Sequence, residues 1–583
     1  MKMNADREGK TDMKNAEIQE KVLSTDVLIV GGGIGGLTAA VRTKEVNPHL
    51  DVVIMEKNTT GYSGKANRGG GVLQYFDFEK CTPDQFVQYH VHNVGAYLGD
   101  QELLHEYVSK NNEMIDKLVE WGVKVPYTED GKLKVVPTGP MVGIIGVDLD
   151  ITLQVRKAAV KLGVKILDKV VMSDVLTSEG KAVGAVGYSL LDGTFHVVKA
   201  KTVVLATGSQ NYKIMPMWNG RGDGIAAAYR AGAEMRNTEF GNFAQQYTAR
   251  AHHDAVFTEN VMYNALGENI TKNFRRFREA DVSSKAVAEW YKQMSAGKGP
   301  ISVHREEYEV TAHGDAMFTT PRVWDRPYGI EVWKRIYGKA AERDGDCKEI
   351  VMCLVGEQSP VKVGHDMQTT IPGLYAIGDL SYTGSTAPGA VPAPPGRNRG
   401  SGILNAVFNG LIVAESCSDY IEKNSDIAID DDQVKACKER AYAPLLREVG
   451  ISADEVMDDV REAIGPVENS VYMSQHRLEI GLRKVEKAKA KVTQLKAADF
   501  HDLCNCHEAE AMVLSAEMQF KAASMRKESR GWFLREDYPE MDNENWLKYI
   551  IVKNMNGEMV FDTEDVPYEK WAVKPPMFQH GQK

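Results

Sequence analysis

The sequence is long, acidic and ordinary in composition. Its 583 residues exceed what one hydrophobic core usually serves, so two or more domains are expected. The content of 43% hydrophobic and 26% charged residues is typical of a globular protein. The net charge of −11 argues against a general binder of nucleic acid or of anionic membranes, because such proteins normally carry a basic excess.

No apolar run is long enough for a transmembrane helix, and the polar residues 1–23 are predicted to form a loose N-terminal tail. The seven cysteines are sparse and odd in number, which indicates a reducing compartment and predicts a cytoplasmic protein. The sequence contains no CxxCxxC run, so we expect no iron–sulfur cluster bound by this chain itself.

The first chemical motif lies between two predicted strands at 26–30 and 51–56. A GxGxxG loop (Gly31, Gly33, Gly36) follows the first strand and opens a helix rich in small residues. The first glycine permits the tight turn, the second lets a pyrophosphate approach the backbone, and the third lets helix and strand pack closely. The second strand ends at Glu56, whose carboxylate would accept the ribose hydroxyls. Strand, loop, helix and carboxylate together predict a dinucleotide site.

Two later segments distinguish FAD from NAD. Residues 201–205 form a predicted buried strand that ends in Ala-Thr-Gly, and residues 373–377 form another that ends in Gly-Asp. Such strands place small residues and an acid at the carboxyl edge of a parallel sheet, where ligands bind in α/β folds. Asp379 would suit a ribityl hydroxyl. A nicotinamide enzyme needs only the first motif, so the three segments together predict FAD.

Further along the chain, the residues 499–526 show helical periodicity. Within this helix, His501, Cys504, Cys506 and His507 are metal-ligand residue types, but only His501 and Cys504 would share a face, so no metal site is predicted. The lysine-rich run 484–496 is predicted to be a solvated helix face, or alternatively a docking site for an acidic electron carrier.

Four stretches carry a resemblance to a known family: 63–71 (SGKANRGGG), 222–240 (GDG…AGA…EF), 396–414 and 526–547. In their order and content the sequence resembles the flavoprotein subunits of fumarate reductase, succinate dehydrogenase, L-aspartate oxidase and adenylylsulfate reductase, from about residue 24 to about residue 548. The resemblance implies an α/β fold with a split two-dinucleotide-binding-type FAD domain, an inserted α+β capping domain and a helical C-terminal domain. The expected ranges are 24–249 and 355–420 for the FAD domain, 250–354 for the cap and 421–583 for the helical domain and tail.

The motifs and the resemblance together predict a set of FAD-binding residues. The family's covalent-flavin histidine would fall near Ser63 or Gly64, and neither can be alkylated as a histidine is, so the resemblance implies noncovalent FAD. The predicted residues are Gly31, Gly33, Gly35, Gly36, Glu56, Lys57, Ser63, Gly64, Gly70, Gly71, Ala206, Thr207, Gly208, Asp223, Gly378, Asp379, Ser401, Ile403 and Leu404.

The expected substrate site departs from the family pattern. The family's histidines fall on Ala244 and Ala393, its H-x-x-M-G-G run is replaced by residues 355–359, and no arginine stands near residues 283–284 where a proton-delivering one is expected. Only Arg397 matches the substrate arginine. Because a buried dicarboxylate needs paired donors, this loss argues against succinate and fumarate.

Arg397 could hold one carboxylate or sulfonate in bidentate fashion, or could form a salt bridge that fixes its own loop. The proton donor is left open among Lys285, Tyr247 and His253, with His252 beside the last. Histidine titrates near neutrality and therefore suits acid–base work.

The sequence thus predicts an FAD-dependent reductase or dehydrogenase that transfers hydride between flavin N5 and an activated C=C bond of a small anionic substrate. The resemblance implies an iron–sulfur protein as electron partner, in a homo- or hetero-oligomer. Two alternatives remain: an adenylylsulfate-reductase-like enzyme, which the segment 296–301 favours, and a non-catalytic flavin electron relay.

Overall fold

The computed structural model describes most of the chain. The described residues are 18–67, 71–137, 141–147, 150–214, 220–241, 243–249, 261–272, 283–304, 348–382, 401–424 and 428–576.

A seven-stranded sheet forms the centre of the molecule, with the order β6-β2-β1-β9-β8-β7 and with β16 paired to β9. β1 pairs in parallel with β2 and β9, and β2 with β6, whereas β7 and β8 complete the sheet in antiparallel fashion. The strands are β1 (Glu20–Val30), β2 (Val52–Glu56), β6 (Lys165–Asp168), β7 (Val170–Ser178), β8 (Lys181–Ser189), β9 (Phe195–Leu205) and β16 (Leu374–Ala376).

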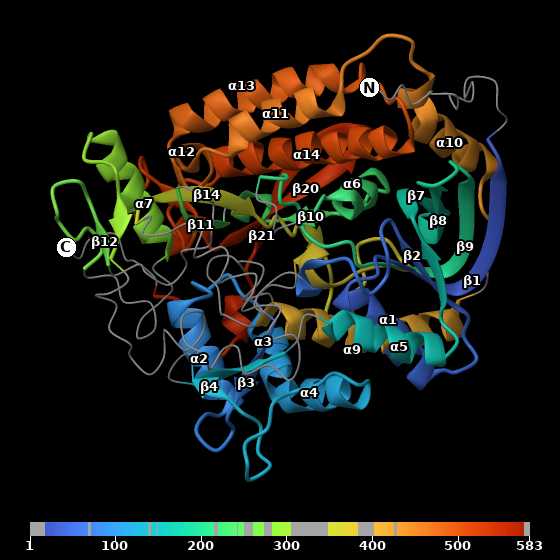
Figure 1. The fold of residues 1–583 in the computed structure, drawn as a ribbon, viewed down its shortest axis with the longest axis horizontal. Coiled ribbons are helices and arrows are strands. Elements are labelled where there is room, and N and C mark those ends of the chain that lie inside the picture. Colours follow the sequence, from blue (N-terminus) through green and yellow to red (C-terminus); the bar gives the residue numbers. More distant parts are fainter. Residues whose placement is uncertain are drawn as a thin grey trace, which may run out of the picture.

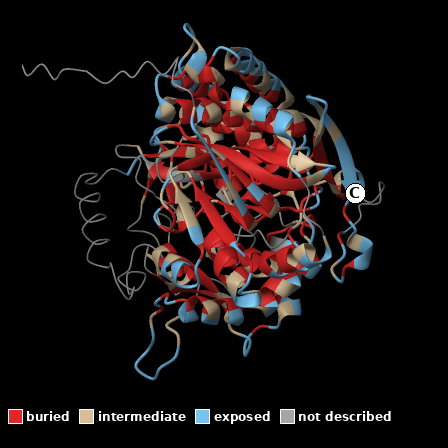
Figure 2. Cartoon of the chain, turned by 90° about the vertical axis from the view of Figure 1, so that its right-hand side faces the viewer, coloured by how far each residue is buried: buried red, intermediate tan, exposed pale blue. Residues whose placement is uncertain are grey.

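The central strands of this sheet are apolar at consecutive positions, because helices cover both faces of the sheet. Every residue of β2 is buried, and the last four residues of β1 are as well. Figure 1 shows α1, α5 and α9 together below the sheet, and Figure 2 shows buried residues concentrated in the middle layer. These helices are α1 (Ile34–Val46), α5 (Ile151–Lys161) and α9 (Ser401–Lys423); α6 (Asp223–Arg230) packs against β7.

Two smaller sheets flank the central one. The first has the order β3-β5-β4 and lies near α2, α3 and α4; the second has the order β17-β15-β10-β20-β21. Their elements are β3 (Val72–Phe76), α2 (Pro83–Asn93), α3 (Gln101–Ser109), α4 (Asn111–Glu120), β4 (Val136–Pro137), β5 (Val142–Gly146), β10 (Met235–Arg236), β15 (Val361–Lys362), β17 (Ser381–Tyr382), β20 (Lys548–Met555) and β21 (Glu558–Asp565).

The described part of the predicted cap begins and ends at a two-stranded ribbon. β11 (Phe243–Thr248) pairs with β14 (Ile350–Gly356) in antiparallel fashion. The boundaries predicted at residues 249 and 354 fall at this ribbon. Between them the structure describes β12 (Met262–Tyr263), α7 (Ser283–Ser295) and β13 (Ser302–Val303).

Helices dominate the C-terminal part, as expected. α11, α13 and α14 pack on one another above the central sheet (Figure 1). The helical periodicity predicted at 499–526 corresponds to α14, which is buried almost all round. The elements are α10 (Asp431–Leu446), α11 (Ala453–Ile464), α12 (Val467–Ser470), β18 (Tyr472–Met473), α13 (Gln475–Val492), α14 (Phe500–Met525), β19 (Leu534–Arg535) and α15 (Asn543–Trp546).

Two expectations differ from the structure at the ends of the chain. β1 begins at Glu20, inside the predicted tail 1–23, because its first residues pair with the first half of β9. Residues 548–565, expected to belong to the helical domain and tail, form the β20–β21 hairpin. The missed signal is Asn556-Gly557, both with positive φ (55° and 91°), because such a dipeptide favours a tight hairpin turn.

Candidate functional site

The three glycines of the GxGxxG loop differ in what surrounds them. Gly31 has φ +110°, and an added Cβ there would lie 2.4 Å from the Ala206 carbonyl oxygen. At Gly36 the Cβ would lie 2.0 Å from the Gly31 oxygen. At Gly33 it would meet no described atom within 4 Å. The first and third glycines are therefore required by the protein's own packing, whereas the second leaves space for a ligand.

Glu56 braces the loop from the end of β2. Its buried carboxylate accepts a hydrogen bond from the Gly32 N–H at 2.6 Å through one oxygen, and from the Asn58 N–H at 2.7 Å through the other. Each carboxylate oxygen can accept more than one hydrogen bond. The structure thus gives Glu56 a role in loop geometry, and its contact with ribose stays a prediction.

Lys57 and Asp223, both predicted to bind FAD, pair with each other. The Lys57 ammonium also contacts Glu508 of α14 at 2.9 Å, and Lys213 contacts the second oxygen of the same carboxylate. Burial of Glu508 disfavours its charged form, but the positive charges of Lys57, Lys213 and Arg221 outweigh burial and lower its pKa to about 2. A C-terminal helix is therefore joined electrostatically to the end of β2.

The loop that begins at Ser63 lies beside the glycine-rich turn. An added Cβ at Gly64 would stand 3.5 Å from Gly33 Cα. The Ser63 hydroxyl is buried and donates to the Thr59 carbonyl at 3.2 Å. Gly71 has φ +55° and accepts from the Val147 N–H at 2.7 Å as β3 begins. Gly70 lies outside the described residues.

Lys65, in the short helix η1 (Lys65–Asn67), joins this loop to both parts of the FAD domain. Its Nζ lies 2.7 Å from Ser209 Oγ and 3.1 Å from both Glu357 Oε1 and Asp379 Oδ2. Burial disfavours the ammonium, but the two carboxylates outweigh burial and raise the pKa of Lys65. Asp379, predicted to meet a ribityl hydroxyl, therefore has a protein partner on one oxygen.

The ends of β9 and β16 meet at the carboxyl edge of the central sheet, as predicted. Ala376 of β16 pairs with Leu205, and Ala206-Thr207-Gly208 follow β9 directly. Gly208 has φ +80°, and an added Cβ would meet no described atom within 4 Å. Gly378, in η6 (Gly378–Leu380), has φ +63°, and its N–H donates to Asn409 Oδ1 at 3.0 Å.

The start of α9 packs against α1. Gly35 faces Ala406, whose Cβ would lie 3.5 Å from an added Cβ. Leu404 is fully buried and Ile403 half-buried, and the contact of each with a flavin stays a prediction. Ser401 begins the helix, and its side chain is outside the described part.

The residues present fit FAD. Three segments far apart in the sequence converge on one edge of the parallel sheet, and the backbone at Gly33 and Gly208 faces open space among the described residues. The helix α1 begins directly after Gly33, so its N-terminus can receive a phosphate group.

The candidate substrate residues are only partly described. Arg397, His252, His253 and Ala393 lie outside the described residues. Tyr247 is buried on β11, whereas Lys285 is exposed on α7. Ala244, at the position of a family histidine, is buried on the same strand as Tyr247.

The segment that replaces the family's H-x-x-M-G-G run makes contacts within the protein. Gln358 donates to the carbonyl oxygens of Thr238 at 2.9 Å and Ser515 at 3.1 Å, and Glu357 binds Lys65. Sequence reasoning missed Lys65 and Glu357. The position of Lys65 within a glycine-rich segment could have marked it as a candidate site residue. No sequence pattern near either residue predicts its contact with Glu357.

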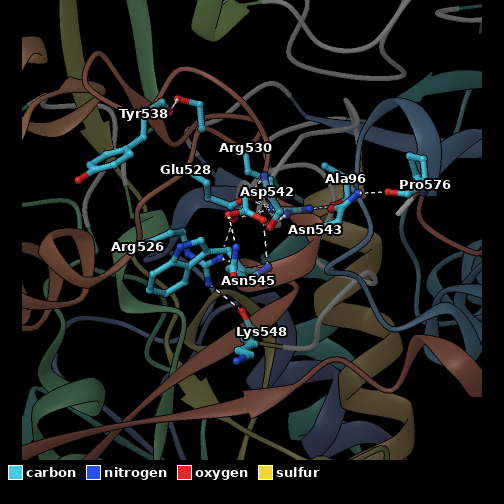
Figure 3. Close-up of polar contacts among 12 residues, drawn as sticks. Ala96, Arg526, Glu528, Arg530, Tyr538, Asp542, Asn543, Asn545, Lys548 and Pro576 are labelled. Atoms are coloured by element: carbon cyan, nitrogen blue, oxygen red, sulfur yellow. Dashed lines mark hydrogen bonds and ion pairs between the residues drawn. The ribbon is translucent and has the colours of Figure 1, made fainter. Parts of the chain in front are cut away.

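The C-terminal motif 526–547 forms a buried network of ion pairs. Arg526 donates to Glu239 and Glu528, each at 2.8 Å, and Glu528 also pairs with Arg530 at 2.7 Å. Figure 3 shows Arg530 reaching the carbonyl oxygen of Ala96, and Arg526 that of Lys548. The motif therefore joins the C-terminal domain to the preceding domains.

Among the metal-like residues of α14, His507 has two protein partners. His507 contacts the Ala441 carbonyl at 2.8 Å through Nε2 and Glu510 at 3.1 Å through Nδ1. Cys504 and Cys506 are buried free thiols, while His501 is exposed. The described helices include none long and apolar enough to cross a membrane.

Comparison with known proteins supports FAD as the cofactor. Residues 26–262 match the family model of the FAD binding domain, and residues 467–579 match the fumarate reductase flavoprotein C-terminal model. The 8-methylmenaquinol:fumarate reductase flavoprotein subunit of Wolinella succinogenes is 25% identical, over 94% of this chain and 92% of that one. L-aspartate oxidase of Acinetobacter baylyi is also 25% identical, over 92% and 97%.

Among solved structures, adenosine-5-phosphosulfate reductase in complex with sulfite shares the fold. Its TM-score is 0.75 at 22% identity, with 96% of this chain and 98% of that chain covered. Fold, site and family models together define an FAD-dependent oxidoreductase. The chain carries the FAD-binding domain and the C-terminal domain of fumarate reductase flavoproteins, and its homologues include flavoprotein subunits of fumarate reductase and L-aspartate oxidase, which confirms the resemblance found in the sequence.

Proposed function

We propose that this enzyme transfers hydride between flavin N5 and an activated C=C or CH–CH bond of a small anionic substrate other than succinate or fumarate. The supporting observation is the chemistry at the positions of the family's substrate histidines. Ala244 offers no donor, and Glu357 and Gln358 are engaged by Lys65, Thr238 and Ser515. A dicarboxylate placed there would lack paired donors, which costs several kcal/mol in a buried site.

Bound FAD supplies the hydride acceptor or donor, and the protein supplies binding, orientation and protons. In this proposal Arg397 holds the anionic group of the substrate in bidentate fashion. Tyr247 is favoured over Lys285 as the proton donor because its side chain is buried, whereas Lys285 is exposed on α7. His253 stays an alternative donor.

Electrons would be exchanged with a separate iron–sulfur protein. Two observations support a separate partner: the sequence has no CxxCxxC run, and the Wolinella succinogenes relative is named as a subunit. Reduction of the bound flavin by such a protein, without mediators, would test this part of the proposal.

The substrate class is tested with the FAD-loaded protein, reduced viologen and a panel of unsaturated monocarboxylates, dicarboxylates and sulfonates. We expect turnover of a singly anionic substrate and at most weak turnover of fumarate. Arg397→Ala should reduce kcat/KM by roughly 100-fold or more, as loss of a bidentate, charge-assisted contact does, and Lys285→Ala should change it little. Robust fumarate turnover would contradict the proposal.

Two further measurements test the alternatives, a sulfur-oxyanion enzyme and a non-catalytic flavin electron relay. Turnover of adenylylsulfate would favour the sulfur-oxyanion enzyme. An Arg397→Ala variant that retains every activity of the assembled complex would favour a flavin electron relay.

A further inference from the structure

Lys65 is a buried cation at the point where the parts of the flavin site converge. Ser209 follows the Ala-Thr-Gly segment after β9, Asp379 follows β16, and Glu357 follows β14. All three place an acceptor within 3.1 Å of the Lys65 Nζ atom. One side chain therefore joins the loop at residues 63–71 to three strand ends.

Lys65 lies between two acidic side chains. Lys65 contributes one positive charge, and the carboxylates of Glu357 and Asp379 contribute two negative ones. Glu357 is fully buried, and the side chains of Lys65 and Asp379 are each 14% exposed. Because an uncompensated buried carboxylate is costly, loss of the lysine would strain both acids.

The three acceptors also limit what Lys65 can do. A lysine ammonium has three N–H donors, and among the described residues Ser209, Glu357 and Asp379 each offer it an acceptor. The ammonium is thus oriented by the protein, which suits a positioning residue better than a proton donor to the substrate.

The cluster adjoins the space left for the cofactor. Gly64, next to Lys65, lies against Gly33, and Ser209 follows Gly208; the backbone at Gly33 and at Gly208 faces open space among the described residues. The cluster is therefore placed to act on bound flavin through its charge. A positive charge near flavin favours the reduced form, because reduction increases electron density on the ring system, and a negative charge has the opposite effect.

We propose that Lys65 is a positioning residue of the flavin site: it fixes Asp379 and Glu357 at the carboxyl edge of the sheet and raises the midpoint potential of bound FAD. The proposal depends on FAD binding and not on the substrate. It can therefore fail while the proposed function holds, and the proposed function can fail while this proposal holds.

The test uses the FAD-loaded full chain with Lys65→Met, Glu357→Gln and the double variant. Lys65→Met adds one net negative charge to the cluster, so the midpoint potential should fall, and FAD should dissociate at least tenfold more readily. Glu357→Gln removes one negative charge, so the potential should rise. The double variant restores the net charge of the wild type and should return toward its potential. A tenfold change in the relative affinity for the two flavin states corresponds to about 30 mV for a two-electron couple.

Lys491→Met is the matched control. Lys491 of α13 also bridges two carboxylates, Glu455 at 2.8 Å and Asp459 at 2.5 Å, but it lies among the C-terminal helices. Its loss should leave the potential and the FAD affinity unchanged. If Lys65→Met fails to fold, the rise expected for Glu357→Gln still decides the matter. Single variants that shift the potential in the same direction, or a Glu357→Gln variant without a shift, would overturn the proposal.

Discussion

At the scale of the residue, the glycines of the dinucleotide loop separate folding from binding. Gly36 is required because the Gly31 oxygen occupies the space of a Cβ, whereas Gly33 has an ordinary negative φ of −77° and open space beside it. Gly36 is thus constrained by the packing of the protein itself, whereas Gly33, three positions earlier, is constrained by the ligand.

This difference predicts opposite results for two alanine substitutions. Gly36→Ala should destabilise the apoprotein by about 1–3 kcal/mol, as overpacking in a core does. Gly33→Ala should leave the thermal unfolding midpoint of the apoprotein unchanged and weaken FAD binding by about tenfold or more, because the methyl group occupies space meant for the pyrophosphate. Thermal unfolding of the apoprotein and FAD titration by fluorescence measure the two effects. Equal FAD affinity for Gly33→Ala and wild type would refute the assignment.

At the scale of the element, α14 is more than a packing helix. It buries residues around most of its circumference, and its Glu508 also contacts Lys57, which directly follows β2, and Lys213, which comes after β9. The helix therefore stabilises the adenosine end of the predicted FAD site from another domain.

Glu508 should make stability dependent on pH in the acidic range. Its folded-state pKa of about 2 lies below the ordinary value of 4.5, so its contribution is present above pH 4.5 and is lost as pH falls toward 2. At neutral pH, Glu508→Gln should cost up to roughly 3 kcal/mol, at 1.36 kcal/mol per pKa unit. Thermal unfolding measured from pH 7 down to about pH 2 should show the gap to wild type narrowing below pH 4.5.

Glu486 of α13 is exposed, and Glu486→Gln is the control, expected to change stability by less than about 0.5 kcal/mol. A pH-independent gap between Glu508→Gln and wild type would show that Glu508 does not act through its charge.

At the scale of the whole molecule, the buried arginines of the C-terminal motif join domains that are distant in sequence. Arg526 binds Glu239, which precedes the cap, and Arg530 binds the carbonyl oxygen of Ala96. The side chains of Arg526, Glu239, Glu528 and Arg530 are all fully buried, so each charge depends on the others for compensation.

Removal of Arg526 should therefore affect the entire protein. Arg526→Met leaves Glu239 without its partner and should destabilise the protein by about 3–5 kcal/mol. Arg42→Met, which removes a partly exposed arginine paired with Glu45 and Glu415, should cost no more than about 1 kcal/mol. Thermal unfolding midpoints of the two variants compare them directly, and similar midpoints would contradict an interdomain role for the buried network.

Much of the fold could be predicted because its signals are local. The GxGxxG loop, the apolar strands that end in Ala-Thr-Gly and Gly-Asp, and the periodicity of α14 each depend on a short window of sequence. The β20–β21 hairpin was also encoded locally, in Asn556-Gly557, and was overlooked. The extension of β1 to Glu20 was not local, because it depends on pairing with β9.

The sequence by itself determined the cofactor, the family and the absence of the family's histidines at Ala244 and Ala393, because these follow from residue types in a fixed order. Only the tertiary structure decided which charges meet. Lys65 and Glu357 are separated by 292 positions, and Arg526 and Glu239 by 287, yet each pair is in contact. Ion pairs between domains follow from packing, and residue order alone carries no information about which charge a buried side chain will face.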